Sequence, residues 1–204
     1  MAFHVWQVGS ESNSGAGSTV VTEALSRVSA CFAPDEPQGS AEALAVSIRH
    51  SFLVSADTAH AIHPNWAEKH QSAHTPKLNE GTVIKTNDNQ RYATNTETGF
   101  VIRELARQAG VGIQEFMVKN DCPCGSTIGP MISAKTGLRT VDVGVPLLSM
   151  HSIRETMGTA DIESSLKLKK AFFRSFTDLD AKCNFVCPMA DCGGASALLS
   201  RRDF

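Results

Sequence analysis

Apolar positions along the chain recur at two spacings, one typical of helices and the other of short buried strands. The helical spacing predicts five helices, and Gly110 and Gly137 are expected to end the third and fourth. Ser18 or Thr19 is the expected N-terminal cap of the first helix, and Ser40 that of the second. The predicted helices cover residues 20–29, 40–48, 96–109, 128–136 and 155–176.

Between these helices lie short apolar runs that predict buried strands at residues 52–56, 82–85, 115–118 and 138–143. Single strands that alternate with helices predict an α/β domain, a three-layer sandwich in which a mostly parallel mixed sheet is flanked by helices. Functional residues of such domains lie in the loops that follow the strands. We therefore expect Asp57, residues 122–127 and His151 to lie at strand ends, and the stretches around Asp57 and His151 to meet in space.

Composition narrows the class of protein. Hydrophobic residues make up 42% and charged residues 20% of the 204 residues, as in a soluble globular domain. The net charge of −2, without a basic run, argues against a nucleic-acid partner, and no apolar run is long enough for a membrane span. The N-terminus lacks the pattern of a secretory signal, so a cytoplasmic location is expected. We assign residues 1–180 to one domain and residues 181–204 to a poorly ordered tail.

The six cysteines are expected to be reduced thiols, because a disulfide scaffold is typical of smaller secreted chains. Cys122 and Cys124 are too close in sequence for the usual zinc knuckle, which favours a tight turn before a helix. Cys183, Cys187 and Cys192 supply three thiols. A structural zinc site and a disordered tail are both compatible with them, and the second is favoured.

Three groups of side chains are candidates for a site. Asp57, His60 and His63 carry the carboxylate and imidazole groups that bind catalytic zinc, although a strand-end Asp that caps backbone donors beside two solvated histidines is the favoured explanation. His151 alone is more typical of a structural histidine. Lys85 and Tyr92 flank a turn, and a cation and a phenol are natural donors to a carboxylate. The alternative for this pair is an ordinary exposed hairpin.

Taken together, several stretches resemble the aspartyl aminopeptidases, the M18 family of zinc metallopeptidases. The similarity runs from about residue 8 to about residue 178 and includes the sequences Ala-Asp-Thr-Ala-His, Gln-Arg-Tyr-Ala and Met-His-Ser-Ile-Arg-Glu. The matching stretches are residues 8–12, 55–65, 90–95, 120–130 and 150–155.

The resemblance implies part of the catalytic domain of a zinc aminopeptidase that releases N-terminal Asp or Glu from peptides. It also implies two zinc ions in each active site and a homo-oligomeric assembly. At the positions that match, Asp57 would bind one zinc ion and His151 the other. His60, Lys85 and Tyr92 would contact the substrate.

The chain departs from the family where the general base is expected. The family has a Glu-Glu pair directly before Val-Gly-Ser, and this chain has Trp6 and Gln7 there. Neither side chain replaces a carboxylate, so we predict no catalytic base, with Trp6 at that position. The chain also begins too late to include the upstream zinc-binding His and the bridging Asp of the family. The isolated chain is therefore expected to be inactive or nearly so.

Two other hypotheses remain open. The chain is either a non-catalytic subunit that associates with a full-length paralogue and modulates it, or a small zinc-binding module formed by the cysteine tail. The resemblance further implies that upstream strands complete the sheet in the full-length family. Without them, strand edges are expected to be exposed.

Overall fold

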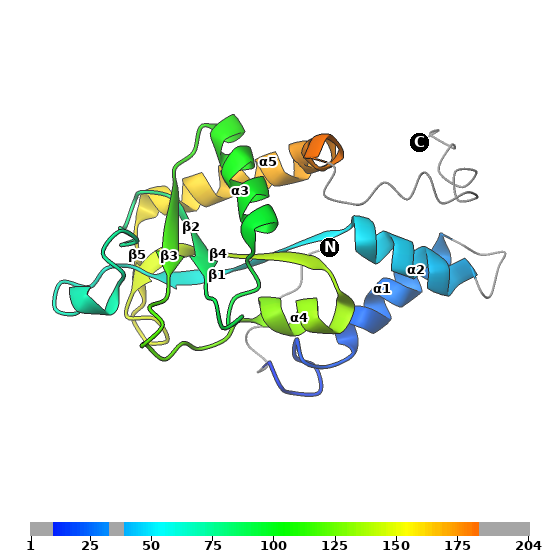
Figure 1. Cartoon of the computed structure of the whole chain (residues 1–204), viewed down its shortest axis with the longest axis horizontal. Helices are drawn as coiled ribbons and strands as arrows, with labels where there is room; N and C mark the ends of the chain where they lie inside the picture. The colour runs from blue at the N-terminus through cyan, green and yellow to red at the C-terminus, as the bar shows by residue number, and fades with distance from the viewer. Residues whose placement is uncertain (1–9, 33–38, 184–204) are drawn as a thin grey trace.

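The computed structural model describes residues 10–32 and 39–183, which form a mixed sheet between two layers of helices (Figure 1). The helices are α1 (Val20–Cys31), α2 (Gly39–His50), η2 (Ala67–Lys69), α3 (Thr96–Ala109), α4 (Ile128–Thr136) and α5 (Thr159–Cys183). The strands are β1 (Phe52–His60), β2 (Thr82–Thr86), β3 (Ile113–Met117), β4 (Arg139–Leu148) and β5 (Thr156–Met157).

The sheet has the strand order β1-β4-β2-β3, and the short strand β5 pairs with β4. β1 runs parallel to β4 and β2 parallel to β3, whereas β2 and β5 are antiparallel to β4. Helices α3 and α5 cover one face of the sheet and α4 lies on the other, with α1 and α2 beyond it (Figure 1). The predicted sandwich of a mixed sheet between helices is confirmed.

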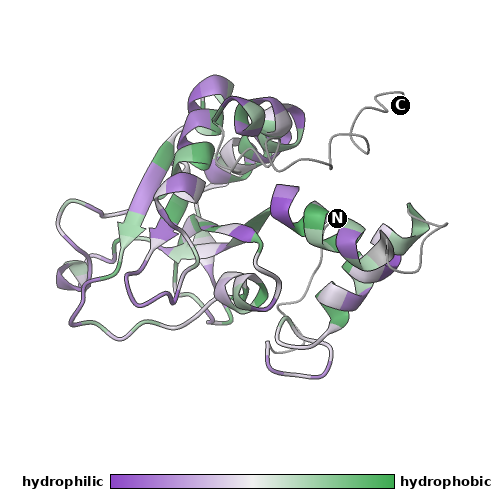
Figure 2. Cartoon of the chain, turned by 45° about the vertical axis from the view of Figure 1, so that its right-hand side comes forward, coloured by the Kyte–Doolittle hydropathy of each residue, from purple (hydrophilic) through white to green (hydrophobic). Residues whose placement is uncertain are grey.

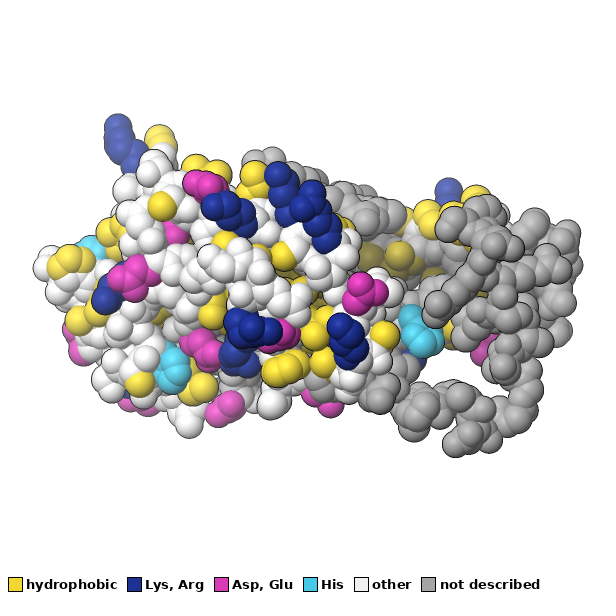
Figure 3. Space-filling view, turned by 90° about the horizontal axis from the view of Figure 1, so that it is seen from above, with side chains coloured by type: hydrophobic (Ala, Val, Ile, Leu, Met, Phe, Trp, Pro, Cys, Tyr) yellow, Lys and Arg dark blue, Asp and Glu magenta, His cyan; other side chains and the backbone are white. Residues whose placement is uncertain are grey.

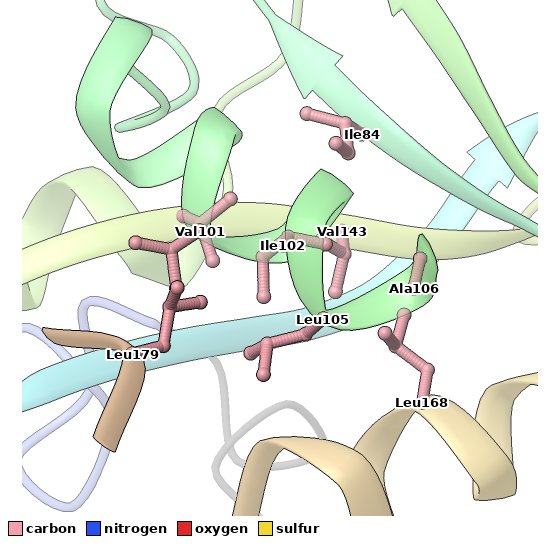
Figure 4. Packing of buried hydrophobic residues seen from close by; sticks show 9 residues of the cluster. Ile84, Val101, Ile102, Leu105, Ala106, Val143, Leu168 and Leu179 are labelled. Atoms are coloured by element: carbon pink, nitrogen blue, oxygen red, sulfur yellow. The ribbon is translucent and has the colours of Figure 1, made fainter. Parts of the chain in front are cut away.

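The main core lies between the sheet and the layer of α3 and α5. Val101, Ile102 and Leu105 of α3 are at most 2% exposed and point at the strands and at α5 (Figure 4). The sheet contributes Ile84 from β2 and Val143 from β4, both buried in the same cluster. This face buries most of the large aliphatic side chains, so it holds the sheet against its helices.

A smaller core lies on the opposite face, where Ile132 of α4 packs with Leu53 of β1 and with Ala16 and Val21. Helices around both cores combine hydrophobic and hydrophilic residues (Figure 2). They bury one side and expose the other, as their apolar spacing predicts.

The third predicted helix, residues 96–109, has the bounds observed for α3. Asn95 caps it, since its side chain accepts from the backbone N–H of Thr98, while Thr98 accepts in return from the backbone of Asn95. Gly110 ends it with a φ of 63°, a left-handed conformation that glycine adopts easily. Phe100 is an exception among the apolar residues of the helix, because it is 45% exposed.

Other element ends differ from the prediction. β1 does not stop before Asp57 but continues to His60, and β4 continues past Gly144 to Leu148. The two strands pair in parallel along nine positions, so backbone hydrogen bonding carries both beyond their apolar runs. The second helix begins at Gly39, so Ser40 lies inside its first turn. The last helix begins at Thr159, because residues 156–157 form β5.

The last helix continues to Cys183, and the rest of the expected tail lies outside the described residues. Of the helices that the structure describes, none combines the length and apolar character needed to cross a membrane. On the face seen from above, basic, acidic and hydrophobic side chains are interspersed (Figure 3).

The outer edge of β1 pairs with no other strand among residues 10–32 and 39–183. A cavity of about 470 Å³, here called the β1 slot, runs beside residues 52–57 and reaches into both helical layers. Its walls include Ile128 and Ile132 of α4 and Leu168 and Phe172 of α5. The slot thus continues the middle layer of the sandwich beyond its last strand.

Gly144 of β4 lies tightly against the backbone of β1, and it stands beside Asp57 in the sheet register. A Cβ atom there would lie 2.6 Å from the carbonyl carbon of Thr58. We predict that Gly144→Ala lowers the free energy of unfolding by about 1–3 kcal/mol, because the strand backbones must separate. Urea denaturation measures this change.

The matched control is Gly125→Ala, because a Cβ at Gly125 meets nothing within 4 Å. An equal free energy of unfolding for the two variants would contradict the close approach at Gly144.

Candidate functional site

The ammonium group of Lys85 is the centre of the candidate site. The Lys85 side chain is 2% exposed, and its Nζ lies 3.4 Å from Oδ2 of Asp57 and 3.0 Å from the carbonyl oxygen of Thr58, to which it donates. The ring centroid of Tyr92 lies 5.1 Å from the same nitrogen. A buried cation needs such partners, because burial without them strongly disfavours its charge.

These side chains share the face of the sheet that α4 covers. Asp57 stands opposite Gly144 in β4, and Gly144 stands opposite Val83 in β2. Alternate residues of a strand point to the same face, so Lys85 joins Val83 there, with Phe116 of β3 opposite Lys85. The side chain of Lys85 therefore reaches Asp57 across the position where Gly144 has no side chain.

Tyr92 follows β2 in the loop that leads to α3, and it is 8% exposed. Its ring lies 6.4 Å from that of Phe116, measured between centroids. Burial raises the pKa of the phenol, and a hydrogen bond with Cys124 raises it further. Tyr92 is consequently a neutral hydrogen-bonding group throughout the physiological pH range.

His60 is the last residue of β1, and its ring lies 6.4 Å from that of Phe116. Partial burial lowers its pKa, and the nearby charges of His70, Lys85 and His151 lower it further. The imidazole of His60 is therefore mostly neutral at neutral pH. His70 approaches the same place, with its Nε2 3.3 Å from the carbonyl oxygen of His60.

His151 lies in the loop between β4 and β5, in a left-handed conformation with a φ of 66°. Its backbone N–H donates to the Glu155 carboxylate, and its side chain is exposed. Its charge is one of the smaller contributions that lower the pKa of His60. His63 instead shapes the loop after β1, because its Nδ1 accepts from the backbone N–H of Asn65 at 3.1 Å.

The structure thus brings Asp57, Lys85 and Tyr92 into direct proximity, with His60 beside them and His151 within electrostatic range. Asp57 lies inside a strand rather than after one, which corrects the expectation of a strand-end carboxylate. A polar residue is tolerated there because Lys85 supplies the opposite charge.

Zinc fits the described residues poorly. No group of three or more His, Cys, Asp or Glu side chains in residues 10–32 and 39–183 is arranged to hold a metal ion. The carboxylate of Asp57 faces the ammonium of Lys85, and a catalytic zinc ordinarily takes three protein ligands. Trp6, Gln7, Cys187 and Cys192 lie outside the described residues.

Sequence reasoning missed three residues at the site. Phe116 contacts the rings of His60, His70 and Tyr92, and it was assigned only to a strand. His70 lay in a segment without regular spacing. Asp142 was assigned to an apolar strand, and its complete burial is a signal that only the structure provides.

The fold agrees with one family of metallopeptidases. The profile of the family described as aminopeptidase I zinc metalloprotease (M18) matches residues 2–173. The chain therefore belongs to the M18 family.

Its relatives within the family include aspartyl aminopeptidases. The chain is 52% identical over 176 residues to the aspartyl aminopeptidase of Dictyostelium discoideum, covering 85% of this chain and 36% of the relative. It is 51% identical to the probable aspartyl aminopeptidase of Ricinus communis, covering 86% of this chain and 35% of the relative. The chain thus spans about a third of the length of these relatives.

Solved structures agree with the fold. A chain of a cryo-EM complex of Ape4 and Nbr1 superposes with a TM-score of 0.79 at 46% identity, over 86% of this chain and 32% of the other. An S. cerevisiae mApe1 dodecamer superposes with a TM-score of 0.73 at 28% identity, over 89% of this chain and 39% of the other.

Tyr92 is the single tyrosine of the chain, so its ionisation can be followed without interference from another phenol. Its pKa is raised in the folded chain, so its contribution to stability is complete below the unfolded pKa of about 10 and is lost as the pH rises above that value. We predict that tyrosinate absorbance in an alkaline titration appears above pH 10 and together with unfolding.

The urea-unfolded chain serves as the control for this titration and should ionise near pH 10. A folded chain that ionises at the same pH as the unfolded one would contradict the burial of the phenol.

Proposed function

We propose that the chain is the acid-recognising part of a zinc aminopeptidase that releases N-terminal Asp or Glu from peptides. The observation that carries the proposal is the buried ammonium of Lys85 beside the phenol of Tyr92. Membership of the M18 family and the names of the relatives support the reaction class.

The chain's own residues would act on the substrate side chain. Lys85 and Tyr92 are donors, and a carboxylate accepts from both, so an acidic residue would bind where Asp57 now faces the ammonium. Neutral His60 adds a donor or acceptor without adding a second positive charge. A neutral amide in place of the carboxylate would lose the charge contribution, so we expect a preference for Asp over Asn.

The zinc in this proposal rests on membership of the M18 family, whose description names zinc. Asp57 and His151 would each serve as a ligand, and the described residues contain no complete set around either. Further ligands from outside those residues are required. The family position of the general base is held by Trp6, which cannot accept a proton from water. We therefore propose that the chain recognises acidic residues and does not hydrolyse peptides by itself.

The first test is the binding of short peptides with an N-terminal Asp or Asn, measured by calorimetry with and without added zinc. We predict tighter binding of the aspartyl peptide and loss of that preference in Lys85→Met. Lys77→Met is the matched control, because Lys77 is exposed on the surface and pairs only with Glu80 among the described residues. Equal binding of both peptides by the unmodified chain would contradict the proposed recognition.

Hydrolysis of an aspartyl substrate, measured in the same samples, separates recognition from catalysis. No turnover is expected. Turnover that disappears in both Asp57→Ala and His151→Ala would overturn the expected inactivity and show that the chain completes its own metal site.

The β1 slot favours a second candidate function, a non-catalytic subunit that associates with a full-length M18 chain. An open strand edge between two helical layers is a ready place for an added strand. The related mApe1 of S. cerevisiae forms a dodecamer, so oligomeric assembly occurs within the same family.

The association is tested with the full-length aspartyl aminopeptidase of Dictyostelium discoideum, mixed with this chain and separated by size-exclusion chromatography. We predict co-elution and its loss in Ala56→Glu, because Ala56 lies at the exposed edge of β1 and lines the slot. Ala41→Glu, on exposed α2, is the control. A chain that elutes alone at every mixing ratio would exclude the subunit function.

A further inference from the structure

Asp142 is a fully buried carboxylate whose partners come from two separate loops. Its Oδ2 accepts from the backbone N–H of Ala93 at 2.6 Å, and its Oδ1 accepts from the hydroxyl of Thr127 at 2.7 Å. Its own backbone N–H donates to the hydroxyl of Thr94 at 2.9 Å. No salt bridge to Asp142 is found in the part of the chain that the structure describes, so these hydrogen bonds must offset the cost of burial.

The N-terminus of α4 also offsets the cost of burying the Asp142 carboxylate. Thr127 is the N-cap of this nine-residue helix, and the partial positive charge of a helix N-terminus stabilises a nearby carboxylate. Gly129 makes the approach possible, because a Cβ there would lie 2.5 and 2.6 Å from the two carboxylate oxygens of Asp142. The carboxylate therefore depends on the absence of a side chain at this position.

Both loops that are hydrogen-bonded to Asp142 support Tyr92. Ala93 is the next residue in the chain, so its hydrogen bond fixes the backbone that carries the phenol. Thr127 ends the loop that carries Cys124, whose thiol contacts the phenol. The same carboxylate thus anchors the support of Tyr92 on two sides.

We propose that Asp142 is a positioning residue, which holds Tyr92 over the Lys85 ammonium by tying both supporting loops to β4. The significance for substrate rests on the proposed function, in which Tyr92 donates to an acidic residue. The geometry itself does not depend on that function, so the two are tested separately.

A second buried carboxylate provides the matched comparison. Asp161 is also fully buried, and it accepts from the backbone N–H groups of Asn79 at 2.7 Å and Gly81 at 2.9 Å. It ties the loop before β2 to the start of α5. Neither Asn79 nor Gly81 is a neighbour of Tyr92 in sequence. Asp161 is therefore buried and hydrogen-bonded to a loop like Asp142, but it does not hold a segment that carries Tyr92.

The test replaces the single tyrosine of the 204-residue chain with fluorotyrosine, so that fluorine NMR gives one signal from position 92. Its chemical shift reports the environment of the ring, and its relaxation by a soluble gadolinium chelate reports exposure to solvent. Asp142→Asn removes the charge and one acceptor. Gly129→Ala keeps the charge and displaces the carboxylate, which separates position from electrostatics.

We expect both variants to move the signal towards that of the unfolded chain and to increase its relaxation by the chelate. Asp161→Asn and Gly125→Ala, when folded, should keep the original signal. A folded Gly129→Ala chain with an unchanged signal would overturn the proposal. So would a Gly129→Ala chain that fails to fold while Gly125→Ala folds, because Asp142 would then support the whole core rather than Tyr92.

Discussion

The charge on the Lys85 ammonium is the constraint on which the rest of the site depends. A cation with 2% of its side chain exposed must be offset locally, and Asp57 and the Thr58 carbonyl do so from the neighbouring part of the sheet. This requirement explains why β1 carries an acidic residue in its interior. It also explains why Gly144 stands between them, since any side chain there would occupy the path of the lysine and crowd the β1 backbone.

The two faces of the sheet have different roles: one packs the main apolar core and the other carries the polar site. The face under α3 and α5 is aliphatic and holds the main core, whereas the face under α4 carries Asp57, Lys85, Asp142 and Phe116. Buried charges are tolerated on the second face because each has defined polar partners. A polar site on a rigid sheet is well ordered, and its stability is supplied largely from the opposite side.

Apolar spacing predicted the layered fold and the bounds of α3, whose C-terminal end is marked in the sequence by Gly110. Strand ends were less predictable, because β1 extends past Asp57 through pairing with a strand that is remote in the chain. At the site, Lys85 and Tyr92 were predicted as donors to a carboxylate, and they lie close together. Their role towards a substrate stays a prediction. The role of Asp142 was not visible, since its partners Ala93 and Thr127 have no spacing that connects them to β4.

The long-range pairing of β1 with β4 has a consequence for folding kinetics. Phe52 pairs with Arg139, so β1 cannot pair with β4 until the ribosome has synthesised the residues of β4. Non-local parallel pairing forms slowly, because the entropy of closing a long loop is lost before the contacts are made. Since the other edge of β1 finds no strand among the described residues, the nascent chain holds an unpaired strand throughout this interval. The yield of folded protein in cells should therefore depend on chaperones more strongly than the yield of a domain with local contacts.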